Sequence, residues 1–357
     1  MNVRRQVINQ FRRALSILQR QRTMEELFQK AVKRNEEMKK PSNSVPWKPD
    51  QPHPQPYYTY NSSKKSWDKA ECKPLQQANS APGINRLALF SWNIDFMLPF
   101  AKERMNAALD HLDGVTSKLP STTAAVIFLQ ECLVEDLATI GEKGWVRDKF
   151  NVTDVDNSNW QSGYYGTTTL VDRRLDVTSC FRVHYEKTRM ERDALFVDVL
   201  LGNKTIRLCN THLESLALEP PFRPAQMQVV AKYLHEDGVD GALVAGDFNA
   251  IQPFDRTLHS DNNLKDAYLE LGGKEDSDEG YTWGQQAATE FRRRFGCSRM
   301  DKVYFTGKLK LHRFERFGAD IQVSGKKEAE KLIALDFEKP WITDHLGVVA
   351  EVEVDES

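Results

Sequence analysis

Five short stretches of the chain end apolar runs in side chains that could do chemistry together. In LVAGDFN, Gly246 allows a bend at the end of a strand-like run, and Asp247 and Asn249 follow it. Residues i and i+2 of an extended chain share a face, so these two side chains would point into one site. The other stretches contribute, in chain order, Asn93 and Asp95 of WNID, Glu131 of FLQE, His212 and Ser215 of THLES, and Asp344 and His345 of TDH.

The combined set is rich in oxygen ligands and contains no thiol. Hard oxygen ligands favour Mg²⁺ or Mn²⁺ over Zn²⁺. Beside such an ion a held carboxylate such as Asp247 can take a proton from water, and two histidines can donate to phosphate oxygens as charge develops. A lone acid at a strand end or a lone histidine is usually structural. Their recurrence at strand ends throughout one domain instead predicts metal-assisted phosphodiester hydrolysis.

Strands and helices must bring these stretches together, and periodicity predicts where they lie. Residues 100–112 place an apolar face on a helix, and residues 224–234 form another with Pro near its first turn. Residues 124–131 are almost continuously apolar, which indicates a strand buried on both faces. Further strands are predicted at 86–95, 163–171, 176–185, 194–202, 204–215, 243–249, 300–307 and 345–354. So many strands with interleaved helices predict an α/β (α+β) fold, with two packed sheets and helices outside.

The chain divides into three predicted parts. Residues 1–40 form an amphipathic helical extension with six Arg and no acid before Glu25. That composition allows either a mitochondrial presequence or a surface helix that binds a partner. Residues 41–85 form a Pro/Asn/Ser-rich linker that cannot propagate a helix or a central strand, although Trp47, Tyr57 or Tyr58 could pack on the domain surface. Residues 86–357 form the catalytic domain.

Bulk properties restrict the partners. The formal net charge is −2, so attraction to nucleic acid requires a local basic patch. Residues 291–295, with three consecutive Arg and with Arg299 nearby, are a candidate for DNA contact; the alternative is a solvated loop that balances the acidic stretch at 275–279. The five cysteines are scattered without a CxxC pair, which argues against a disulfide framework. We find no apolar run long enough to cross a membrane and no secretory signal.

WNID, FLQE, THLES, GDFN and TDH, in this order, resemble the motifs of the endonuclease/exonuclease/phosphatase superfamily. Within it the chain resembles the tyrosyl-DNA phosphodiesterase 2 subfamily. That likeness depends on THLES followed by Arg223 and Gln226, YTWG at 281–284, RMDKVYF around Asp301 and TRMER at 188–192. It covers residues 87–354 and implies a DNase I-like four-layered α/β sandwich.

The resemblance also implies a role for each matching side chain. Glu131 would be the main Mg²⁺ ligand, with Asp95 as a second ligand that also contacts substrate, and Asp247 would activate the attacking water with Asn249 beside it. The remaining implied site residues are Asn93, which shapes the metal and phosphate site; His212, His345, Ser215 and Arg192, which contact substrate; Asp301 and Asp344, which support His345 and the metal; and Trp283, which lines the DNA end or packs in the core. The chain departs from the family pattern at Ala250 and Ile251, where Arg is common.

The implied activity is hydrolysis of the bond between a DNA 5′-phosphate and a tyrosine, as left by a trapped topoisomerase II. The implied partners are DNA 5′ ends with tyrosyl or peptide adducts and topoisomerase II remnants, and the chain would act as a monomer. The nucleus is the expected location, with the cytoplasm or the mitochondrion as alternatives. Rival functions are those of an abasic-site endonuclease, an RNA exonuclease, a lipid or inositol phosphatase, or a non-catalytic scaffold.

Overall fold

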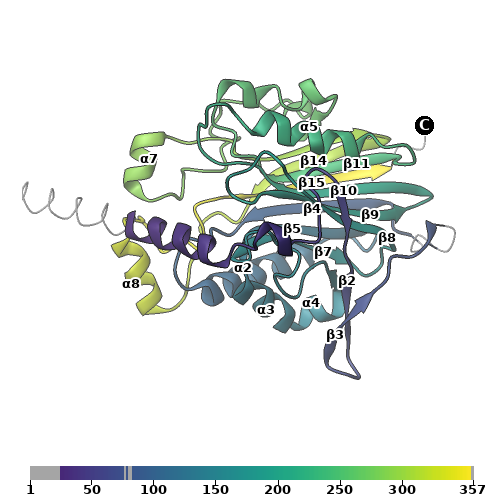
Figure 1. The fold of residues 1–357 in the computed structure, drawn as a ribbon, viewed down its shortest axis with the longest axis horizontal. Coiled ribbons are helices and arrows are strands. Elements are labelled where there is room, and N and C mark those ends of the chain that lie inside the picture. The colour runs from purple at the N-terminus through teal and green to yellow at the C-terminus, as the bar shows by residue number, and fades with distance from the viewer. Residues whose placement is uncertain (1–24, 76–77, 79–82, 355–357) are drawn as a thin grey trace, which may run out of the picture.

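Two β-sheets packed face to face form the centre of the molecule in the computed structural model, which describes residues 25–75, 78 and 83–354 (Figure 1). Within these residues one sheet has seven strands, in the order β1 (Pro52–Pro54), β8 (Val177–His184), β9 (Asp193–Leu201), β10 (Lys204–His212), β11 (Gly241–Asp247), β13 (Asp301–Gly307) and β12 (Lys265–Asp266). The other has eight, in the order β14 (Leu309–Phe317), β15 (Gly347–Val354), β4 (Arg86–Asn93), β5 (Thr123–Leu133), β7 (Tyr165–Asp172), β6 (Phe150–Val152), β2 (Tyr57–Asn61) and β3 (Ser66–Ala70).

Helices cover the outer faces of both sheets (Figure 1). The eight-stranded sheet packs against α2 and α3, and the seven-stranded sheet packs against α5. The described helices are α2 (Ala101–Thr116), α3 (Val134–Glu142), α4 (Gly144–Lys149), α5 (Arg223–Leu234), α6 (Ala267–Glu270), α7 (Thr289–Phe295), α8 (Lys326–Ala334), the short 3-10 helices η1 (Ser42–Ser44), η3 (Pro253–Arg256) and η4 (Ser260–Asn262), and a helix over residues 25–38.

Alternation along the central strands fills separate cores. In β4, Leu87 and Leu89 face the other sheet, whereas Phe90 and Trp92 face the helical layer that contains α2. Because both faces of the strand are buried, its sequence shows little polar alternation. The result is a helix–sheet–sheet–helix sandwich, which confirms the predicted fold.

Two parallel strand pairs determine where the site lies. β4 pairs in parallel with β5 after the crossover through α2, and β10 pairs in parallel with β11 after the crossover through α5. The carboxyl ends of parallel neighbours meet at one edge of a sheet. One such pair lies in each sheet, and the two pairs of strand ends meet at one end of the sandwich, where the Asn93 amide at the end of β4 donates to Asp247 at the end of β11.

The predicted linker at 41–85 is wrong for residues 52–70. Here β1 pairs with β8 at the edge of one sheet, and the β2–β3 hairpin extends the other sheet through β6. An edge strand accepts proline because one row of its backbone N–H groups needs no partner, so Pro52 and Pro54 do not prevent pairing. Trp47 is buried and stacks on His184. The predicted amphipathic face and Arg-rich start at 1–24 lie outside the described residues.

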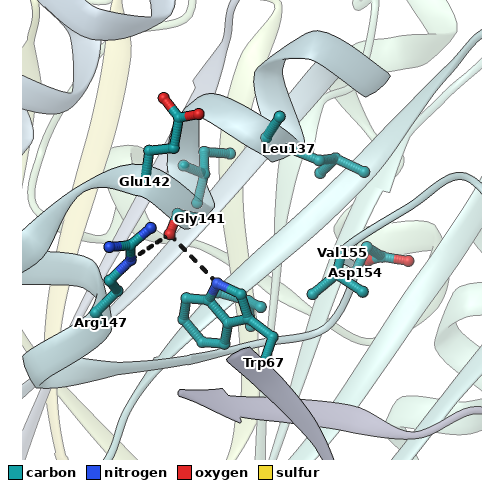
Figure 2. Close-up of a pocket in the computed structure, with 10 residues that line it drawn as sticks. Trp67, Leu137, Gly141, Glu142, Arg147, Asp154 and Val155 are labelled. Carbon is teal, nitrogen blue, oxygen red and sulfur yellow. Dashed lines mark hydrogen bonds between the residues drawn. The ribbon is translucent and has the colours of Figure 1, made fainter. Parts of the chain in front are cut away.

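A shallow pocket of about 210 Å³ lies between β3, α3 and α4 (Figure 2). Within it the Gly141 carbonyl accepts hydrogen bonds from the Arg147 guanidinium and the Trp67 indole. None of the predicted site residues lines this pocket, so it is separate from the strand ends that carry them. Among the helices that the structure describes, none has the length and apolar character needed to cross a bilayer.

Candidate active site

Strand register brings three predicted residues into one row. His212 at the end of β10 lies opposite Asp247 at the end of β11, and Asp247 lies opposite Asp301 at the start of β13. Directly opposed residues on neighbouring strands place their side chains on the same face. Gly246 is required beside this row, since a Cβ there would stand 1.7 Å from the Thr211 carbonyl oxygen of the adjacent strand.

A β-bulge aims Glu131 at this row from the other sheet. The β5–β7 register shifts between Leu129 and Cys132, and Glu131 adopts a left-handed backbone with φ of 59°. A bulge of this kind re-aims a side chain that regular alternation would direct elsewhere. The Glu131 carboxylate then accepts a hydrogen bond from the Phe96 backbone N–H at 2.9 Å and lies 3.7 Å from His212 Nε2.

Asp247 is the centre of the cluster. Its Oδ2 accepts a hydrogen bond from the Asn93 amide at 2.9 Å and lies 3.3 Å from His212 Nε2 and 3.7 Å from His345 Nε2. Burial opposes its ionisation, but His345 and His212 outweigh that cost and hold the pKa of Asp247 well below its usual range. The site therefore presents an ionised acceptor among hydrogen-bond donors.

Asn249 reaches the site in a different way from the one predicted. β11 ends at Asp247, and Asn249 has a left-handed backbone with φ of 48°, so strand alternation does not place the two side chains on one face. Instead the Asn249 backbone N–H donates to Asp247 Oδ1 at 2.8 Å, and its side-chain amide donates to the Leu213 carbonyl at 3.0 Å. Asn249 thus joins the loop after β11 to the loop that follows His212.

His345 is fixed by a carboxylate. Its Nδ1 lies 2.8 Å from Asp301 Oδ2, and its Nε2 faces Asp247. Burial disfavours the imidazolium, but the charges of Asp301 and Asp247 prevail and raise the pKa of His345 well above its ordinary value. Asp301 thus lies behind His345, on the side of the ring away from Asp247.

His212 is fixed by a cation instead. Arg192 Nη1 contacts His212 Nδ1, and a guanidinium can only donate, so Nδ1 is the acceptor and the ring proton lies on Nε2. Nε2 in turn faces Asp247 and Glu131. Arg192 is buried and its guanidinium lies 5.3 Å from the ring centroid of Tyr165, so it also belongs to the wall of the site.

Two further acids lie beside Glu131. The Trp283 indole donates to Asp344 Oδ2 at 2.6 Å, so this half-buried tryptophan is neither simple core packing nor a free stacking surface. Burial raises the pKa of Asp344, and burial with the charges of Asp344 and Glu131 raises the pKa of Asp95 well above its ordinary value. The Asp95 carboxylate accepts from the Met97 backbone N–H at 3.0 Å.

One residue that the sequence analysis overlooked holds two site loops together. Arg104 of α2 is fully buried and donates to the carbonyls of Ile94 and Asp95 after β4 and of Ile342 before His345. Its only sequence signal is a charge within the apolar stripe of a helix. Two other bonds support the same region, from Thr343 Oγ1 to the Asn93 carbonyl and from the Trp92 indole to the His345 carbonyl.

Other predicted contacts fall at the margin or outside the cluster. Ser215 is half-buried in the loop after β10, and in the described structure its hydroxyl makes no hydrogen bond to another site residue. Arg299 is wrong as part of a DNA surface, because it is buried and paired with Asp266 and Glu275. Ile251, which stands where Arg is common in the family, is exposed.

The donor set fits a metal ion. Among the described residues, one ligand atom each from Glu131, His212 and Asp247 lies within 4.8 Å of the others, and the same holds for Asp247, Asp301 and His345. The first group is the better candidate, because Asp301 and His345 already satisfy each other. Within it the carboxylates of Glu131 and Asp247 are the ligands, since His212 Nε2 carries its ring proton. Asp95 belongs to neither group, so its predicted role as a direct ligand gains no support from this geometry.

Comparison with known proteins identifies the family. A profile of the Endonuclease/Exonuclease/phosphatase family matches residues 90–345, which include the cluster from Asn93 to His345. The chain belongs to this family. Enzymes of the Endonuclease/Exonuclease/phosphatase family are metal-dependent, in agreement with the ligand group around Asp247.

Several relatives within the family share a name. A Caenorhabditis elegans protein named 5′-tyrosyl-DNA phosphodiesterase is 27% identical over 236 residues, which cover 64% of this chain and 60% of the relative. Tyrosyl-DNA phosphodiesterase 2 of Rattus norvegicus is 26% identical over 61% of this chain and 57% of its own length. The chain therefore spans less than two thirds of these curated relatives.

Solved structures give the same fold. Truncated Caenorhabditis elegans TDP2 superimposes with a TM-score of 0.58 at 23% identity and covers 75% of this chain and 98% of its own. TDP2 of D. rerio, complexed with a single-strand DNA product, has a TM-score of 0.59 at 17% identity, with 75% and 99% coverage. At these identities the likeness establishes the architecture of the chain.

Proposed function

We propose that this protein is a metal-dependent phosphodiesterase that hydrolyses the 5′-phosphotyrosyl bond between a DNA end and a covalently trapped protein. One observation carries the proposal: an ionised Asp247 lies between His212 and His345, beside Glu131, which could ligate a metal ion. The names of the relatives in Caenorhabditis elegans and Rattus norvegicus supply the substrate class.

The protein's own residues suit each part of such a reaction. Asp247 can accept the proton of the attacking water, since it is ionised and held by Asn93 and Asn249. The Nε2 atoms of His212 and His345 face the same carboxylate and can donate to phosphate oxygens as negative charge builds up. The carboxylates of Glu131 and Asp247 would hold the cation, which supplies Lewis-acid stabilisation of the phosphate.

The identity of the metal follows from ligand preference. Two carboxylates suit a hard ion that leaves positions for water and phosphate, so we assign Mg²⁺, with Mn²⁺ as a substitute. Removal with a chelator should abolish turnover. Readdition of Mg²⁺ or Mn²⁺ should restore it, and restoration by Zn²⁺ alone would contradict the assignment.

A basic surface on α7 can receive the DNA end. Arg292 and Arg294 are exposed, Phe295 is 58% exposed, and the Arg294 guanidinium lies 5.0 Å from the Phe295 ring centroid. Cations beside an aromatic face suit phosphate contact and base stacking. Arg293 contributes less, since it pairs with Glu290. Replacing Arg292 and Arg294 by Glu should weaken DNA binding and reduce its salt dependence, whereas unchanged affinity and slope would remove α7 from the interface.

The proposal also covers the protein's partners, its oligomeric state and its location in the cell. We place the protein on DNA 5′ ends that carry tyrosyl or peptide remnants of topoisomerase II, as a monomer in the nucleus. The mitochondrion remains the alternative location because of the Arg-rich start at residues 1–24. Imaging of the full-length chain against a chain that begins at Glu25 tests the two locations directly.

A comparison of three substrates tests the activity. The chain with Mg²⁺ is offered a 5′-tyrosyl oligonucleotide, a duplex with an abasic site and poly(A) RNA, each at several concentrations so that kcat/KM can be compared. We expect the tyrosyl oligonucleotide to be preferred. A preference for either other substrate would reassign the protein to another activity of the same fold, and no turnover of any of them would favour a scaffold.

A further inference from the structure

The helix of residues 25–38 contacts two loops at the site end of the sandwich. In Figure 1 it is the dark purple helix that runs beside α8 and α2. Ala31 is buried, and Leu27 packs against the core that includes α2 and α8 residues. This anchors the first half of the helix to the helical layer, and leaves its second half to meet the loops that precede β7 and β9.

Glu191 is the main contact of this second half and of Lys39, which directly follows the helix. Its Oε2 accepts a hydrogen bond from the Asn35 amide at 2.7 Å, and its Oε1 pairs with the Lys39 ammonium. The Glu191 side chain is only 3% exposed and its backbone is left-handed with φ of 53°. A bulky residue keeps that conformation only where its surroundings hold it, and here the helix supplies the bonds.

The second loop is held at the same time. The Arg34 guanidinium donates to the Tyr164 hydroxyl at 3.4 Å, and the Lys40 ammonium donates to the Asn157 carbonyl at 3.0 Å. The backbone approaches so closely that a Cβ on Gly163 would stand 2.3 Å from the Met38 carbonyl oxygen. Tyr164 directly precedes Tyr165, whose ring lies under the Arg192 guanidinium.

The loop of residues 187–192 is thus held from two sides. On the inner side Glu214, two residues after His212, accepts hydrogen bonds from the Arg189 backbone N–H at 2.9 Å and from Thr188 Oγ1 at 2.7 Å. On the outer side the helix holds Glu191. The next residue, Arg192, sets the tautomer of His212.

We infer that the N-terminal helix is a positioning element of the active site, in which Asn35 and Lys39 hold Glu191 so that Arg192 keeps His212 in its Nε2–H form. Among the described residues, no hydrogen bond or ion pair joins this helix to Glu131, Asp247 or His345, so its contacts reach the site through Glu191 and Tyr164. The helix carries both charge signs, which argues against a nucleic-acid surface.

The experiment compares the double variant Asn35→Ala/Lys39→Ala with the native full-length chain. Asn35 lies on the helix and Lys39 directly follows its last residue. Neither side chain belongs to the core, and Ala is compatible with a helix and its end, so we expect the fold to be retained. We expect kcat for a 5′-tyrosyl oligonucleotide to fall about fivefold with KM nearly unchanged, because positioning affects the transition state more than binding. Lys33→Ala is the matched control, since Lys33 is exposed on the same helix and, within the part of the chain that the structure describes, pairs only with Glu37 at 3.7 Å. Lys39→Arg keeps the charge and should retain activity.

The turnover measurement rests on the proposed function, so two other measurements do not use it. Amide hydrogen exchange of residues 187–192 should become faster in the double variant and stay unchanged in Lys33→Ala. Imidazole ¹⁵N spectra should show His212 with its proton on Nε2 in the native chain and a mixture of tautomers in the double variant. Unchanged exchange and an unchanged tautomer would overturn the inference even if the native chain cleaves no tyrosyl substrate, and a rise in kcat would show instead that the helix inhibits the site.

Discussion

Two histidines flank Asp247, and their supporting partners have opposite charge. His345 lies just before β15 of the eight-stranded sheet and contacts the carboxylate of Asp301. His212 ends β10 of the other sheet and contacts the guanidinium of Arg192. Asp301 stabilises a protonated, positively charged ring, whereas Arg192 requires a ring whose Nδ1 carries no proton and can accept a hydrogen bond. The same residue type therefore provides a charged donor on one side of Asp247 and a neutral donor of defined tautomer on the other.

The two histidines also differ in how their supporting partners are held. We refer to His345 with Asp301 as the His345 arm, and to His212 with Arg192 as the His212 arm. Asp301 lies within β13, in register with Asp247, so the His345 arm is fixed by sheet hydrogen bonds. Arg192 lies in a loop just before β9, so the His212 arm depends on side-chain contacts of that loop. Elements with many backbone hydrogen bonds open less readily than loops. We therefore expect the two arms to differ in their sensitivity to substitution.

The largest effect should come from removing the centre that both arms share. Asp247→Asn preserves shape but removes the charge that accepts the proton, so kcat for the tyrosyl oligonucleotide should fall about 10³-fold. Steady-state kinetics measure the loss, and circular dichroism with thermal unfolding confirms that the fold is intact. Near-native activity in a folded variant would show that another group takes the proton.

The His345 arm should rank next. Asp301→Asn leaves a hydrogen-bond acceptor behind His345 but removes the charge that stabilises the imidazolium, so kcat should fall about 100-fold. Asp301→Glu keeps the charge in a longer side chain, so we expect it to retain more activity than Asp301→Asn. If Asn and Glu variants lose the same amount, the charge of Asp301 is not what matters to His345.

The His212 arm should lose less. Arg192→Met keeps most of the side-chain volume but removes the donor to Nδ1, and we expect kcat to fall about tenfold. Arg192→Lys retains a charge and a donor and should fall between the native chain and Arg192→Met. A loss larger than that of Asp301→Asn would reverse the ranking of the two arms.

Features of the fold and the site that depend on neighbouring residues could be predicted from the sequence, whereas features that depend on contacts between distant segments could not. Asp247, His212 and Glu131 end strongly apolar strands, so local pattern and motif order suffice to place them at strand ends. The sandwich follows for the same reason, because strands buried on both faces require layers on either side. Gly246 is also readable locally, since only glycine tolerates the adjacent Thr211 carbonyl.

The features that sequence pattern missed arise from contacts between distant segments. Arg104 is a charge within an apolar helical stripe, and only the fold shows that it joins the loops near residues 94 and 342. The bulge that aims Glu131 depends on pairing with β7, and β1 depends on pairing with β8. The prediction that Asn249 shares a face with Asp247 is wrong, because the extended backbone of β11 ends at Asp247, two residues before Asn249.

A third buried histidine, His184, lies outside the active site. His184 at the end of β8 is buried against Trp47, with ring centroids 3.9 Å apart. Burial and the charge of Arg182 lower the pKa of His184 from 6.5 to about 2. Asp193 lies 3.7 Å from its Nδ1 but is already paired with Arg182, so it does not restore the charge. Here the surroundings accept only the neutral ring.

This lowered pKa makes stability depend on pH in a defined direction. The unfolded chain takes up a proton at His184 near its ordinary pKa of 6.5, whereas the folded chain does not until about pH 2, so this group's contribution is lost as pH falls below about 6.5. At pH 5 that amounts to about 2 kcal/mol relative to pH 7. His184→Phe, which can still stack on Trp47, should flatten the fall in the free energy of unfolding between pH 7 and pH 5, measured by urea titration. His235→Phe, at the exposed end of α5, is the matched control and should leave the slope unchanged; an equal slope in the native chain and His184→Phe would show that His184 is protonated in the folded state.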